Sequence, residues 1–300
     1  MRSFPAIVPA VVAAVIALSP GGLRAAEQLI PPEAVVLLRP LPLVDAGPGG
    51  TLPIRASGIT VRHNKTYYTD DARPQALVAD AAAPERVTRR FRFRSGWQGA
   101  ADLAYAPRTD TLFALDTLGD AFAVTSFRVS PGTGGVMEIR PPGSRTELAA
   151  DDVPTELRST RAVGVAVSAD ATRLWLLLGG RDDQGGTVVA EFRREESRPD
   201  GWQHLASLPV RCSALPNGTF SPGGLCAHPE GLWLVGSAAR RNVILWLPFG
   251  ADNANLALAG FAPGLTPTGV HDSATRLDLT LQDPKTRRSY LLKVPFLRLK

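Results

Sequence analysis

A pattern of three short apolar stretches separated by turns recurs along this chain of 300 residues. It is clearest over residues 223–250, where GLCAH, LWLV and NVILWLPF are divided by the turn 228–231 and the polar loop 237–241. Apolar runs of this length, rich in Val, Ile, Leu and Trp and bounded by Pro and Gly, are typical of strands rather than helices. The segment therefore predicts three consecutive strands that reverse direction at each turn.

Four other segments repeat this order. Each opens with a small residue and an apolar strand, turns through Pro, Asp, Asn or Gly, and returns through a strand that holds an aromatic or leucine pair. The repeat period is about 45 to 60 residues, which fits a four-stranded propeller blade with long outer connections. The small residues that open the five copies are Gly58, Asp102, Gly164, Gly224 and Gly269.

We therefore predict an all-β fold, a β-propeller of five blades. Six blades are the alternative if residues 139–161 contain a further hairpin, and a β-sandwich with long loops is the alternative fold. The fifth copy has no fourth strand before the chain ends, so the stretch EAVVLL at 33–38 is expected to complete it and close the ring, which removes unpaired sheet edges. Fourth strands of the other copies are expected at 87–93, 134–139, 202–210 and 254–260.

The N-terminal segment has the pattern of a secretion signal. Arg2 supplies a positive start, residues 6–18 are apolar but short for a membrane span, and Ala25-Ala26 offers a cleavage point. We therefore expect a signal peptide at 1–26 and a single propeller domain at 27–300. Arg and Ala are abundant, which suggests a GC-rich bacterial genome and hence a periplasmic or secreted protein that does not span the membrane once processed.

Two cysteines, Cys212 and Cys226, flank one loop of the fourth copy. In an exported protein, two cysteines so close are expected to form a disulfide, which would stabilise the fold by about 3 kcal/mol in the chain-entropy model. Two free buried thiols or a metal-binding pair are the alternatives.

The charge pattern argues against nucleic-acid binding. The formal net charge is +5, and loss of the signal would leave about +3, scattered along the chain. The densest basic run, RVTRRFRFR at 86–94, alternates Arg with apolar residues. Alternation puts the two classes on opposite faces of a strand, so we interpret the run as an outer blade strand with a solvated Arg face. A patch for an anionic surface or partner is the alternative.

Two of the repeated segments, GVAVSADATRLWLL and GLCAHPEGLWLV, resemble the repeat core of the NHL, SMP-30/gluconolactonase-like and phytase-like-esterase propellers, and ADLAYAPRTDTLFALDTLGDAF looks most like the last of these. The resemblance implies a fold shared by proteins that hydrolyse lactones or esters and by proteins that only bind. Lactonase-like members hold a divalent metal through an acid early in one blade, a position that Asp102 matches. The copies that open at Gly164, Gly224 and Gly269 bring no such acid, so the metal-ligand set is incomplete.

Loops that enter the first strand and loops between the second and third strands share one face of a propeller, where function usually lies. Carboxylates converging on the channel there could hold Ca²⁺. Candidate metal ligands are Asp102, Asp116, Asp182 and Asp183. Candidate residues of a binding rim are Asp70, Asp71, Arg181, Arg240, Arg241 and Asp283.

Three histidines, His63, His228 and His271, lie at or near the first turns of copies one, four and five. A three-His metal site would need these turns to converge, and they lie on the opposite face from the predicted rim.

Two functions are compatible with these patterns. The first is a monomeric binding or scaffolding module for a protein, glycan, envelope component or small-molecule ligand. The second is a Ca²⁺-assisted hydrolase of esters, lactones or phosphoesters. The chain has no G-x-S-x-G nucleophile elbow and no Gly-rich phosphate loop before a helix. The missing acids favour binding.

Overall fold

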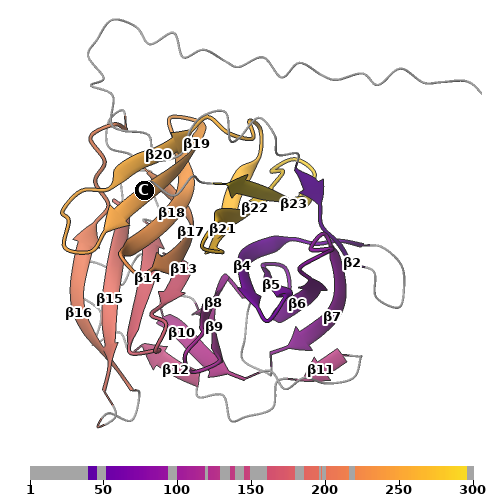
Figure 1. The fold of residues 1–300 in the computed structure, drawn as a ribbon, viewed down its shortest axis with the longest axis horizontal. Coiled ribbons are helices and arrows are strands. Elements are labelled where there is room, and N and C mark those ends of the chain that lie inside the picture. The colour runs from indigo at the N-terminus through magenta and orange to yellow at the C-terminus, as the bar shows by residue number, and fades with distance from the viewer. Residues whose placement is uncertain are drawn as a thin grey trace, which may run out of the picture.

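The computed structural model describes residues 40–45, 52–93, 100–118, 121–128, 136–138, 145–148, 161–179, 186–195, 197, 201–215 and 220–295. These residues form strands and turns without an α-helix, arranged as a five-bladed β-propeller (Figure 1). The blades follow one another around the ring in chain order, from indigo through orange to yellow. The prediction of an all-β, five-bladed propeller is confirmed.

Each blade is built on four antiparallel strands arranged from the axis outward. In blades one to four this order follows the sequence, whereas the outermost strand of blade five comes from the N-terminal part of the chain. The innermost strands are β4 (Ala56–Arg62), β8 (Asp102–Ala106), β13 (Arg161–Val167), β17 (Ser221–His228) and β21 (Thr266–Asp272). The second strands are β5 (Lys65–Asp70), β9 (Thr111–Leu118), β14 (Arg173–Gly179), β18 (Gly231–Ala238) and β22 (Arg276–Gln282). The third strands are β6 (Gln75–Asp80), β10 (Ala121–Phe127), β15 (Val188–Arg194), β19 (Arg241–Pro248) and β23 (Ser289–Pro295). The outermost strands are β7 (Arg86–Arg92), β12 (Arg145–Leu148), β16 (Trp202–Pro209), β20 (Asn255–Ala259) and β1 (Leu41–Pro42).

The core is divided into five layers, one between each pair of neighbouring blades. Successive residues of a strand point to opposite faces of its sheet, so one strand contributes to two layers. In β18, Leu232 and Leu234 pack toward blade three, whereas Trp233 and Val235 pack toward blade five. Strands buried on both faces need apolar residues at nearly every position, which explains the continuous apolar runs in the sequence.

The axis is narrowest where the small residues that open the five copies meet. A Cβ atom on Gly224 would lie 2.6 Å from the Cα atom of Gly269, and a Cβ atom on Gly269 would lie 2.7 Å from the Cα atom of Gly58. Four of the five inner strands also shift register directly before this residue. The period read from the sequence is therefore set by close packing at the axis. Four of the five copies carry glycine there because a Cβ atom would clash with the next blade, and the second copy carries Asp102.

The ring is closed by the N-terminal part of the chain, as predicted, although by a different segment. Strand β1 pairs with β23 and completes blade five, with Leu41 opposite Leu291. The stretch 33–38, which was expected to do this, lies outside the described residues. Closure by β1 joins the two ends of the chain in one sheet.

The outermost strand of blade two differs from the prediction. The segment expected there contains β11 (Val136–Glu138), which instead pairs in parallel with β7 of blade one. Blade two is completed by β12, which pairs with β10. The outer edge of β7 would otherwise have unpaired backbone groups. Strand β2 (Val44–Asp45) pairs with the first residues of β7, and β11 pairs with its last residues. Strand β2 also pairs with β3 (Leu52–Pro53).

Strand β7 itself is an outermost strand with exposed arginines, as interpreted from its alternation. Arg86 and Arg92 are exposed, and Val87 and Phe91 are buried. Arg90 pairs with Asp45 of β2, so one of these arginines holds the strand that covers the edge.

The predicted disulfide is wrong, because Cys212 and Cys226 are free thiols. Cys212 is buried in the layer between blades three and four. Cys226 packs toward the layer between blades four and five, while the preceding residue, Leu225, faces the same layer as Cys212. The sheet of blade four therefore separates the two sulfur atoms, despite their closeness in sequence.

Candidate functional site: a pocket on the propeller axis

A pocket of about 560 Å³ lies on the axis. Its wall begins with the residue that follows each small axial residue, and it extends along the inner strands to the turns that follow them. The pocket therefore opens on the face of the first turns. The sequence analysis expected function on the other face, so this pocket lies opposite to that expectation.

Asp102 lies at the axis directly before Leu103, which lines the pocket. Its carboxylate is fully buried, with Oδ2 accepting a hydrogen bond from the backbone N–H of Val165 (2.9 Å) and Oδ1 from that of Leu103 (2.8 Å). Burial raises the pKa of Asp102 well above its usual range, against the lowering effect of the backbone N–H groups of Val165, Leu103 and Leu225. Asp102 fills space that glycines leave open on the other blades, since a Cβ atom on Gly58 would lie 2.2 Å from its Oδ1.

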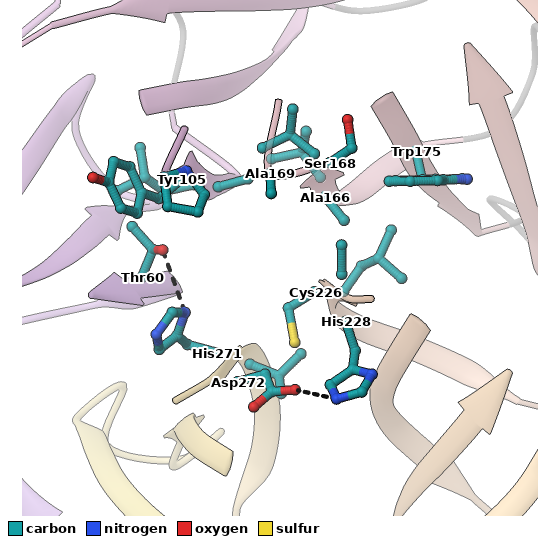
Figure 2. Close-up of a pocket in the computed structure, with 18 of the residues that line it drawn as sticks. Thr60, Tyr105, Ala166, Ser168, Ala169, Trp175, Cys226, His228, His271 and Asp272 are labelled. Atoms are coloured by element: carbon teal, nitrogen blue, oxygen red, sulfur yellow. Dashed lines mark hydrogen bonds and ion pairs between the residues drawn. The ribbon is translucent and has the colours of Figure 1, made fainter. Parts of the chain in front are cut away.

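Polar side chains gather on the side of the pocket formed by blades four and five (Figure 2). Asp272, the last residue of β21, accepts hydrogen bonds at Oδ1 from the backbone N–H of Ala274 (2.7 Å) and at Oδ2 from the indole N–H of Trp233 (3.2 Å). The Nε2 atom of His228 lies 3.9 Å from the same Oδ2 atom. Cys226 lies between these groups in the view of Figure 2.

The two histidines of this side are held differently. The ring of His228 packs edge-on against Trp246, with centroids 5.3 Å apart, and its Nδ1 accepts the backbone N–H of Glu230 (3.2 Å). The Nδ1 atom of His271 lies 3.4 Å from the hydroxyl of Thr60 in blade one. Burial, assisted by the positive charge of Arg276, lowers the pKa of His271 to about 4, so this imidazole is neutral at pH 7.

The Cys226 side chain is a thiol rather than a thiolate. Burial raises its pKa well above the usual value, and the negative charge of Asp272 adds to this. A nucleophilic cysteine needs a lowered pKa, so the surroundings of Cys226 do not activate it. The side chain is nevertheless part of the pocket wall, which makes it a natural reporter of occupancy.

The opposite side of the pocket is aromatic. Trp175 of blade three stacks on Phe249 of blade four, with ring centroids 5.3 Å apart and planes 22° apart, and Phe249 is 41% exposed at the mouth. Tyr105 of blade two also lines the pocket, and its hydroxyl donates to Asp110 (2.9 Å). Asp110 is held in turn by two hydrogen bonds from the guanidinium of Arg62 (2.6 and 2.7 Å), which ties blades one and two together at this rim.

The predicted rim residues that the structure describes lie at turns on the face opposite to the pocket, and several stabilise their own turns. Asp70 is buried and accepts hydrogen bonds from Gln75 and the backbone of Ala72. Asp71 pairs with Arg55 (3.0 Å), and Asp283 accepts from Thr286 and the backbone of Lys285. Arg240 and Arg241 are exposed, and Arg181 lies outside the described residues.

The two described metal candidates, Asp102 and Asp116, are buried on neighbouring strands of blade two. Asp102 points to the axis and bonds to blade three, whereas alternation along β9 puts Asp116 on the same face as Ala114, toward blade one. Asp182 and Asp183 lie outside the described residues. Within the described ranges, no three His, Cys, Asp or Glu side chains are grouped so that they could hold a metal ion. A metal site that includes Asp182 or Asp183 stays a prediction.

Sequence reasoning singled out His228 and His271 but missed Asp272 and the aromatic wall. His63, the third of these histidines, is exposed and contacts Asp110 outside the pocket. The signal that could have found Asp272 is its place at the end of an inner strand, directly after His271. The last residues of three inner strands, Val167, His228 and Asp272, line the pocket, whereas the rim prediction considered only the other ends of these strands.

No protein-family model and no curated protein matches this chain. Solved structures resemble it in fold. The Malassezia sympodialis allergen Mala s 1 superposes with a TM-score of 0.52 at 12% identity, over 85% of this chain and 95% of the allergen. The PQQ-bound aldose sugar dehydrogenase of Streptomyces coelicolor gives a TM-score of 0.46 at 12% identity, over 85% of this chain and 97% of that chain. At such identities the similarity shows a β-propeller and nothing finer.

Proposed function

We propose that this chain is an exported binding protein that holds a small organic molecule in the axial pocket. The observation that carries the proposal is the pocket itself: about 560 Å³, apolar along most of its wall, and polar on one side only. Ligand sites of proteins are typically cavities of roughly 300 to 1,000 Å³ with a few converging polar groups.

A small ligand is favoured over a protein partner by the distribution of exposed apolar side chains. Those of the described residues that are large and exposed, Leu41, Leu52, Leu205 and Phe249, are spread over different blades rather than joined in one patch. A contiguous exposed apolar patch is the feature that marks a stable protein interface on a surface. Phe249 is the one of these that lies at the pocket mouth, where it would contact a ligand.

Export is part of the proposal and rests on the N-terminal sequence alone. The described residues contain no helix that is long and apolar enough to cross a membrane. Cell fractionation with N-terminal mass analysis tests this part, and a protein that keeps Arg2 and stays in the cytoplasm would contradict it. The resemblance to lactonase-like and esterase-like propellers is likewise proposed rather than shown, since no family model matches.

A screen with Cys226 as reporter tests the binding function. Soluble metabolites that raise the melting temperature of the mature protein would be titrated by calorimetry, and their effect on alkylation of Cys226 by iodoacetamide would be followed by intact mass. We expect a true ligand to slow alkylation of Cys226, and the variant Ala169→Trp, at an exposed position of the pocket mouth, to weaken binding.

The matched control is Asn253→Trp, at an exposed turn residue that does not line the pocket. It should leave affinity unchanged. Ligands that bind without protecting Cys226, and that tolerate Ala169→Trp, would place the binding site elsewhere and refute the proposal.

A further inference from the structure

Few charged side chains line the axial pocket, and only one of them lies inside its wall. Besides histidines, its lining contains two ionisable groups that carry charge at neutral pH, Arg173 and Asp272. The Arg173 side chain is 55% exposed and pairs with Glu191 of the neighbouring strand at 3.4 Å. The carboxylate of Glu191, which does not line the pocket, therefore balances the charge of Arg173. The Asp272 side chain is 6% exposed and lies inside the pocket wall. The electrostatic character of the interior is therefore set by one carboxylate.

The groups that donate hydrogen bonds to this carboxylate are neutral. The indole N–H of Trp233 and the backbone N–H of Ala274 are dipoles without net charge. His228 uses Nδ1 to accept the backbone N–H of Glu230, and its Nε2 lies 3.9 Å from Oδ2 of Asp272, so it donates no hydrogen bond to the carboxylate. His271 is neutral. A buried carboxylate without a cationic partner is costly, and a ligand that brings a cation would offset that cost.

The rest of the pocket suits a flat apolar body. Trp175, Phe249 and Tyr105 lie across the cavity from Asp272 (Figure 2 labels the first and last), and the strand walls between them are aliphatic. Faces of aromatic rings attract cations and stack on flat apolar groups. The pocket thus presents an anion at one side and aromatic rings at the other.

We propose that the axial pocket selects an organic cation: a protonated primary or secondary amine that pairs with Asp272 and carries an aromatic or other flat apolar body toward Trp175 and Phe249. This inference rests on the proposed binding function and names its ligand class. Binding requires no covalent step, in keeping with the unactivated Cys226 thiol.

Three probes that share one body and differ in charge test the proposal: tryptamine, the neutral alcohol tryptophol, and the anion indole-3-acetate. Their affinities for the mature protein would be measured by calorimetry at pH 7, with Cys226 protection as the second readout. We expect tryptamine to bind at least about tenfold more tightly than tryptophol, and indole-3-acetate to bind most weakly, because the carboxylate attracts the first and repels the last.

Variants then assign the selectivity to one carboxylate. Asp272→Asn keeps the acceptor for Ala274 and removes the charge, so the tryptamine preference over tryptophol should fall to within about twofold. Asp283→Asn, at the far end of the same blade, makes the same change in net charge away from the pocket and should keep the full preference. Trp233→Phe removes a neutral donor and leaves the charge, so the cation preference should persist even if overall affinity falls.

The outcomes separate the two proposals. Tryptophol binding as tightly as tryptamine, or a preference that survives Asp272→Asn in a variant that melts like the wild type, overturns the cation assignment. Failure of tryptamine at millimolar concentration overturns it too if a neutral compound such as a sugar protects Cys226, and the binding function then stands. Failure of every compound to protect Cys226 defeats both.

Discussion

The backbone N–H of Val165 donates a hydrogen bond to Oδ2 of Asp102 at 2.9 Å, so a side chain of blade two satisfies a backbone group of blade three at the propeller axis. The other oxygen accepts from Leu103 within blade two. Since both oxygens accept hydrogen bonds from buried backbone groups, Asp102 joins blades two and three at the axis.

Replacement of Asp102 by alanine should therefore destabilise the fold. The change leaves two buried N–H groups without an acceptor and opens a cavity at the axis, and each unsatisfied group costs about 1 to 3 kcal/mol. We expect a loss of about 3 to 5 kcal/mol in the free energy of unfolding, measured by urea denaturation at pH 7. Asp252→Ala, at an exposed turn, is the control and should change stability by less than about 0.5 kcal/mol. A loss of less than about 1 kcal/mol in Asp102→Ala would contradict the role of this side chain.

The close approach of backbones at the axis gives a second prediction. Gly224→Ala would bring its Cβ atom to 2.6 Å from the Cα atom of Gly269, a contact that flexible side chains cannot relieve. We expect destabilisation by at least about 2 to 3 kcal/mol, because overpacking here must move a backbone. Gly186→Ala is the matched control, since nothing lies within 4 Å of a Cβ atom built there. Thermal melting of the two variants side by side measures the difference, and equal melting temperatures would refute the packing argument.

The free thiols can be counted directly. Protein purified without reductant and unfolded in urea should take up two equivalents of iodoacetamide, because Cys212 and Cys226 are unpaired. In the folded state we expect slow alkylation at Cys226 and none at Cys212, since only Cys226 lines the pocket and its pKa is raised. The variant Cys226→Ser assigns the reactive site. If the unfolded protein takes up iodoacetamide only after reduction, Cys212 and Cys226 form a disulfide and this prediction is wrong.

His271 should make stability depend on pH. Its pKa of about 4 in the folded state lies below the value of about 6.5 for an unfolded chain, so the unfolded state binds more protons between these values. Stability should therefore rise as pH increases from about 4 to 6.5, by at most about 1.4 kcal/mol per pH unit from this group, and be lost as pH falls through the same range. Urea unfolding of the wild type and His271→Gln at pH 4.5, 5.5 and 7 measures the difference in slope. Parallel curves over this range would show that the folded protein does not hold His271 neutral.

The repeats explain why the fold could be predicted. Strands that are buried on both faces must be apolar nearly throughout, and backbones that meet at the axis must carry a small residue at one position per blade. Both requirements leave local marks in the chain, at Gly58, Gly164, Gly224 and Gly269 and in runs such as those around Leu232 and Leu245. The weak points of the prediction were short outer strands such as β11 and β12, whose pairing depends on which edge is free rather than on their own residues.

The sequence by itself determined the architecture of this protein: five repeats, an axis lined by small residues, and a ring closed from the N-terminal side. Only the tertiary structure decided the chemistry. Cys212 and Cys226 are near in sequence yet are separated by a sheet, and Trp233 and His228 come from different strands of blade four yet both approach the Asp272 carboxylate of blade five. The physical reason is that strand periodicity is a local property, whereas the direction of each side chain relative to the axis depends on how whole blades pack against one another.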